Sequence, residues 1–77
     1  MSRRQQSIQR IRRIRRALVA TASRLTVLRQ GTIDARWAEA AREYHLRERL
    51  KGAYGSLARA CTDNADLMSA LEELSET

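Results

Sequence analysis

The chain has 77 residues, a formal net charge of +6, no Pro and a single Cys. One small domain, 1–77, fits this length, and because twelve of its apolar residues are Ala, its core supports about 3–5 kcal/mol of stability unless a partner, metal or disulfide adds to it. Cys61 alone cannot form an internal disulfide, His45 alone cannot build a zinc site, and no apolar run approaches the roughly 20 residues that span a bilayer.

The charge is distributed as a gradient along the chain. Residues 1–33 carry nine Arg and no acid, residues 34–60 carry six basic and four acidic residues, and residues 61–77 carry five acids and no base. A block of Arg without acids is typical of phosphate binding, of contact with an anionic membrane or an acidic partner, or of a mitochondrial presequence. The structural alternative is a solvated helix face that the acidic C-terminus of the same or a neighbouring chain partly neutralises.

The first predicted element is a helix over about 6–29. Its apolar residues recur every three or four positions, which is the spacing of one helical stripe: Ile8, Ile11, Ile14, Leu18, Ala22, Leu25 and Leu28. Gly31 suits the left-handed position just past a helix end, and Thr32 is predicted to cap the next helix, with Asp34 in its first turn. The short turn, 30–33, makes the two long helices antiparallel neighbours, so the predicted architecture is a helical hairpin.

The second predicted helix, 33–60, has apolar residues on two opposite faces. One face holds Leu46, Leu50, Ala53, Leu57, Ala60 and Cys61, and the other holds Trp37, Ala40, Ala41 and Tyr44. A helix in a lone hairpin needs only one apolar face, so the second face predicts an interface with another chain. Gly52 and Gly55, which each cost about 1 kcal/mol in a helix interior, indicate close approach by another helix, a local bend, or weak helix near a fraying end.

A second break at Thr62-Asp63-Asn64 precedes a short predicted helix, 64–75. Its last turn carries Glu72, Glu73 and Glu76, the unfavourable sign for a helix C-terminus, so we expect it to dock beside the Arg-rich N-terminal segment or else to fray. The expected fold class is therefore all-α, an antiparallel hairpin of two long helices plus a short C-terminal helix.

No motif in the sequence points to catalysis. It holds no Gly-rich phosphate loop, no Ser, His and Asp set and no Gly-flanked nucleophile, so we expect neither an enzyme nor a cofactor or metal site. The sharpest chemical feature is a row of candidate phosphate-binding residues: Arg10, Arg12, Arg13, Arg15 and Arg16. Their segment has no aromatic residue for base stacking and no helix-turn-helix spacing, so nucleic-acid binding through it would be salt-sensitive and sequence-tolerant.

A pattern of helix, turn and aromatic residue carries a family resemblance. Arg29-Gln30-Gly31 ends a basic helix, Trp37 follows six residues after the Gly, and the second helix is rich in Ala and Glu. Over residues 15–60 this arrangement resembles the small co-chaperone of the type III secretion needle subunit, the YscE type. The resemblance implies a hairpin that binds a larger helical-repeat chaperone in the bacterial cytoplasm and, with it, keeps the needle subunit soluble until export. The chain departs from the pattern in its Arg-rich N-terminus, in having Trp rather than Tyr or Phe, and in its additional acidic helix.

Together these features predict a non-enzymatic helical adaptor. Its expected partner-binding residues are Ile11, Ile14, Leu18, Leu25, Trp37, Ala41 and Tyr44. A homodimer that forms a four-helix bundle would satisfy the same apolar stripes. The alternative function is that of a small basic nucleic-acid-binding or phage or plasmid regulatory protein that acts as such a homodimer.

Overall fold

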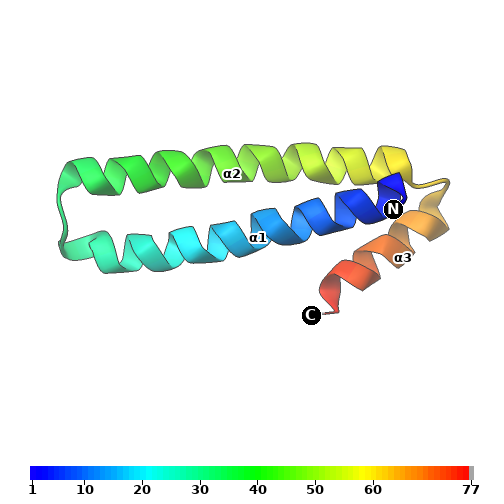
Figure 1. The fold of residues 1–77 in the computed structure, drawn as a ribbon, viewed down its shortest axis with the longest axis horizontal. Coiled ribbons are helices and arrows are strands. Elements are labelled where there is room, and N and C mark those ends of the chain that lie inside the picture. Colours follow the sequence, from blue (N-terminus) through cyan, green and yellow to red (C-terminus); the bar gives the residue numbers. More distant parts are fainter. Residues whose placement is uncertain (77) are drawn as a thin grey trace.

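The chain is an antiparallel hairpin of two long helices with a short third helix packed at its open end (Figure 1). In the computed structural model, which describes residues 1–76, the elements are α1 (Arg3–Val27), the 3-10 turn η1 (Leu28–Gln30), α2 (Ile33–Ala60) and α3 (Asn64–Ser75). The predicted all-α hairpin with a short C-terminal helix is confirmed. The molecule measures 47 × 21 × 20 Å, so it is only two helices thick over most of its length.

The ends of α1 differ from the predicted 6–29. The helix begins earlier because the Ser2 hydroxyl accepts a hydrogen bond from the Gln5 N–H at 3.1 Å, which satisfies one of the free donors of the first turn. It ends at Val27 and tightens into η1, and the Gly31 N–H donates to the Leu28 carbonyl at 2.7 Å. The prediction of a left-handed Gly31 is wrong: its φ is −89°, because the tightened last turn already redirects the chain.

Side-chain caps begin the other two helices, as their sequences predict. The Thr32 hydroxyl accepts from the Ala35 N–H at 3.1 Å at the start of α2. At the start of α3, Asp63 accepts from the Asp66 N–H at 2.8 Å, and the Asp66 carboxylate accepts in return from the Thr62 N–H at 3.0 Å. These reciprocal bonds fix where the chain turns back after α2.

The buried core lies at the open end of the hairpin, where all three helices meet. It consists of the fully or nearly fully buried apolar residues Ile8, Ile11, Ile14, Leu46, Ala53, Leu57, Ala70 and Leu74. The predicted core face of α2 is thus confirmed at Leu46, Ala53 and Leu57. Between residues 22 and 45, in contrast, no described side chain is buried. The half of the hairpin next to its turn, which we name the tip, therefore has no closed apolar core of its own.

Neither glycine of α2 lies against another helix of the described chain. A Cβ at Gly52 would meet no atom within 4 Å, and one at Gly55 would meet only the Arg59 guanidinium, at 3.4 Å. Close approach by another helix of this chain is therefore not the reason for these residues.

Replacing Gly52 by alanine is expected to stabilise the protein by about 0.5–1 kcal/mol, because alanine restricts the unfolded chain and fits the helix without a clash. The shift of the urea midpoint, followed by circular dichroism, measures the effect. A loss of stability would show instead that this position requires glycine.

Candidate functional site

Helix α3 docks on one flank of the Arg-rich helix, as its acidic sequence predicts. Arg4 lies 3.0 Å from Asp66 and 3.3 Å from Glu73, and the Gln5 side chain donates to Glu73 at 3.3 Å. The Arg4 Nε makes no aligned hydrogen bond, so its contact with Asp66 is an ion pair only. Ion pairs this accessible contribute about 0.2–1 kcal/mol each, which leaves the buried Leu74 and Ala70 as the main attachment of α3.

Two further arginines of α1 supply the positive charge that the last turn of α3 lacks. No basic residue lies in that turn. The Arg12 guanidinium donates to the Glu73 carbonyl at 3.1 Å, and Arg15 donates to the Leu74 carbonyl at 3.4 Å. Cations are favourable at the negative end of a helix dipole, so α1 caps α3 from outside. Arg12 and Arg15, predicted as phosphate-binding residues, are therefore engaged within the molecule.

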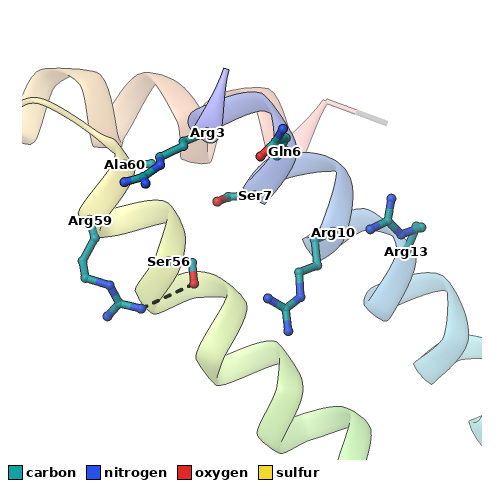
Figure 2. A pocket seen from close by; sticks show the side chains of 8 residues that line it. All are labelled: Arg3, Gln6, Ser7, Arg10, Arg13, Ser56, Arg59 and Ala60. Atoms are coloured by element: carbon teal, nitrogen blue, oxygen red, sulfur yellow. Dashed lines mark hydrogen bonds between the residues drawn. The ribbon is translucent and has the colours of Figure 1, made fainter. Parts of the chain in front are cut away.

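The opposite flank of α1 lines an open groove against α2 (Figure 2). The groove has a volume of about 510 Å³ and is lined by Arg3, Gln6, Ser7, Arg10, Arg13, Ser56, Arg59 and Ala60. Arg3 extends from α1 toward Ala60 at the end of α2, and Arg59 turns back to donate to the Ser56 hydroxyl at 3.4 Å. No carboxylate is among these lining residues.

The groove continues along the hairpin toward the tip. A second hollow of about 290 Å³ shares Arg10 and Arg13 and adds Arg49 of α2. A third hollow, of about 390 Å³, also includes Arg49 and extends to Arg24 and Arg42. The Glu39 carboxylate partly neutralises these last two arginines, since its oxygens lie 3.0 Å from the Arg24 Nε and 3.9 Å from the Arg42 Nε. We name as the arginine groove the five cations that line the first two hollows, none of which makes an ion pair with a carboxylate of residues 1–76: Arg3, Arg10, Arg13, Arg49 and Arg59.

The second apolar face of α2 is open to solvent at the tip. Trp37 is 72% exposed, and Ile33 and Tyr44 are each 62% exposed. Ile33, Arg36, Trp37 and Ala40 line a shallow hollow of about 450 Å³. We name as the tip face the residues Ile33, Trp37, Ala40, Ala41 and Tyr44, all of which are exposed. Trp37 therefore faces away from the core side of α2.

Two of the four predicted partner-binding residues of α1 are buried inside the hairpin, and the other two are partly buried. Ile11 and Ile14 are 0% and 2% exposed in the core of the hairpin, and Leu18 packs against that core. Leu25 is half-buried near the tip. The assignment of Ile11 and Ile14 to a partner interface is therefore wrong, because α2 and α3 already bury the stripe to which they belong.

The predicted phosphate-binding row is divided by the fold. Arg10 and Arg13 lie in the arginine groove, whereas Arg16 lines a hollow on the α3 flank with Arg12, Arg15, Val19 and Leu74. Sequence reasoning missed the groove residues Arg3, Arg49 and Arg59. The spacing of Arg3, Arg10 and Arg13 on one flank of α1 was available in the sequence, but the two arginines of α2 join them only through the register of the hairpin.

Comparison with known proteins assigns no family to the chain. No family model, no curated protein and no solved structure matches it. Within residues 1–76, no group of three or more His, Cys, Asp and Glu residues is placed to hold a metal ion. No helix in the same residues is long and apolar enough to cross a membrane.

Proposed function

We propose that the protein is a non-enzymatic adaptor that binds a helical partner protein through the tip face. The observation that carries this proposal is the contrast between the two ends of the hairpin. The open end has a closed core, whereas the tip has no buried described side chain and presents Trp37 at 72% exposure. A Trp and a Tyr can each bury 150–250 Å² in an interface, and such residues dominate binding energies.

A helical partner fits the shape of this surface. Ile33, Trp37, Ala40 and Tyr44 follow one another every three or four residues, so they form a straight apolar stripe along α2. The small Ala40 leaves a hollow beside the Trp37 ring that could take a side chain of the partner. A partner helix laid along this stripe would bury the outer side of α2, which the hairpin leaves open to solvent, and pairing with a second apolar face is the usual way in which an amphipathic helix surface is completed.

The most concrete form of the proposal is a type III secretion co-chaperone. This form rests on the YscE-type resemblance of the hairpin, its turn at 30–33 and Trp37, which implies a larger helical-repeat chaperone as partner and the bacterial cytoplasm as location. The expected interface is then smaller than the sequence indicates: it comprises Trp37, Ala41 and Tyr44, without the buried Ile11 and Ile14.

Co-expression with a helical-repeat chaperone of a bacterial needle system tests the proposal. The wild-type protein should co-purify with it, and Trp37→Ala/Tyr44→Ala should raise the Kd at least 30-fold, because aromatic anchors at interface centres contribute about 2 kcal/mol or more each. The fluorescence of Trp37, the only Trp of the chain, should shift to the blue on binding.

The matched control is Val19→Ala/Val27→Ala, which removes two apolar residues that are 68% and 79% exposed on α1 and should leave the Kd unchanged. Equal binding by the wild type and the aromatic double variant would refute the role of the tip face. Light scattering measures the mass of the wild type and of the aromatic double variant. If the wild type is a dimer and the double variant is a monomer, the tip face binds a second copy of the chain, and the co-chaperone form of the proposal is refuted.

A further inference from the structure

The arginines of α1 lie on both sides of its buried apolar stripe, and only those on one side contact α3. On one side Arg4, Arg12 and Arg15 contact α3. On the other side Arg3, Arg10 and Arg13 face the groove without a carboxylate partner from residues 1–76. The Asp66 and Glu73 carboxylates that could have neutralised this charge are held on the α3 side. The acidic end of the chain therefore leaves the arginine groove open.

The groove has the dimensions of an extended anion rather than of a single ion. Arg3 and Arg13 are ten residues apart on α1, and Arg49 and Arg59 are ten residues apart on α2, so each row is about 15 Å long at 1.5 Å per helical residue. The helices are antiparallel, which places Arg3 near Arg59 at one end, while Arg13 and Arg49 line a common hollow at the other. The arginines of α1 and α2 thus border two adjoining hollows, which share Arg10 and Arg13.

The chemistry of the lining suits the paired oxygens of phosphate groups. All five cations are Arg, whose guanidinium presents a planar fork that binds phosphate oxygens in pairs. The Ser7 and Ser56 side chains at the floor of the groove add hydroxyl donors between the two rows. No aromatic residue lines the two hollows that hold these five arginines, so bases could not stack there, and the contacts would be made to the backbone only.

We propose that the arginine groove binds the phosphate backbone of a nucleic acid without sequence preference. This site is separate from the tip face, and the inference does not depend on the adaptor function. A duplex carries one charge per about 1.7 Å of its axis, so a groove about 15 Å long meets several phosphates at once. The residues responsible are Arg3, Arg10, Arg13, Arg49 and Arg59, whereas Arg12 and Arg15 cap α3 and Arg16 lies on its flank.

Fluorescence anisotropy with a labelled duplex of arbitrary sequence tests the inference on the full chain. Five phosphate contacts predict a slope of about −4.5 in log K against log salt, which is a loss of affinity of about 500-fold between 50 and 200 mM. Arg3→Gln/Arg10→Gln/Arg13→Gln should reduce that slope by about 2.7, and Arg49→Gln/Arg59→Gln by about 1.8. Two duplexes of unrelated sequence should bind equally.

The matched control removes the same charge elsewhere. Arg16→Gln/Arg29→Gln/Arg36→Gln also lowers the net charge by three, at exposed positions outside the groove, and should keep the slope. Circular dichroism verifies that every variant keeps its helicity. Equal slopes of log K against log salt for the two triple variants would refute the proposed nucleic-acid site, as would absence of binding at 50 mM salt. Displacement of the duplex by polyglutamate at equal charge concentration would overturn the selectivity for phosphate and point to an acidic protein instead.

Discussion

Replacing Leu57 by alanine is expected to unfold most of the molecule. Leu57 is 0% exposed at the centre of the core, and truncation of a buried Leu costs about 2–5 kcal/mol. A core this small supports about 3–5 kcal/mol in total, so the loss is comparable to the whole free energy of unfolding. Far-ultraviolet circular dichroism in water and along a urea titration should show largely lost helicity and a midpoint near zero denaturant.

The control for this prediction is another aliphatic truncation in the same hairpin. Val27→Ala lies at the tip, where Val27 is 79% exposed, and should change the free energy of unfolding by less than about 0.5 kcal/mol. A Leu57→Ala variant that unfolds at the wild-type urea concentration would show that the core is not where the stability of the chain resides.

Replacing Leu74 by alanine is expected to release α3 while the hairpin stays folded. Leu74 is 1% exposed and is the large apolar residue that anchors the last turn of α3 to the core. An isolated helix of 12 residues is marginal in water, and this one ends in three glutamates, so a loss of about 2–5 kcal/mol should leave it mostly unfolded. Hydrogen exchange should accelerate across 64–75 and remain slow in residues 8–14 and 46–57.

Glu73→Gln distinguishes apolar docking from charge pairing. It removes the carboxylate that Arg4 approaches at 3.3 Å but keeps the backbone carbonyl to which Arg12 donates. Exposed ion pairs contribute about 0.2–1 kcal/mol, so α3 should stay docked and its exchange should accelerate less than tenfold. If Glu73→Gln released α3 as fully as Leu74→Ala, electrostatic contacts rather than Leu74 would be its main attachment.

The two proposed binding surfaces lie on different parts of the molecule. The tip face is on the outer side of the first half of α2, whereas the arginine groove follows the junction of α1 with the second half of α2. The variants that test one surface leave the residues of the other unchanged, since Trp37→Ala/Tyr44→Ala keeps every arginine of the arginine groove. Loss of partner binding and loss of nucleic-acid binding can therefore be measured independently on one protein.

The three helices can be predicted from the sequence, because helix formation depends on local features. The three- and four-residue spacing of apolar residues places α2 and α3, and Thr32 and Asp63 cap their own neighbours, which needs no knowledge of the rest of the chain. The two faces of α2 follow from the same periodicity. The end of α1 is harder to predict from the sequence, because the choice between a left-handed Gly31 and a 3-10 turn depends on small differences in backbone energy.

Which of these residues face solvent depends on how the three helices pack against one another. The apolar stripe of α1 looked equally suited to its own hairpin or to a partner, and packing against α2 and α3 assigns Ile11 and Ile14 to the core. The sequence predicts one phosphate-binding set of arginines in this segment. The docking of α3 divides the set into Arg12 and Arg15, which cap a helix, and Arg10 and Arg13, which join Arg49 across a groove. Burial and charge pairing depend on residues that are distant in sequence, so spacing along one helix cannot settle them.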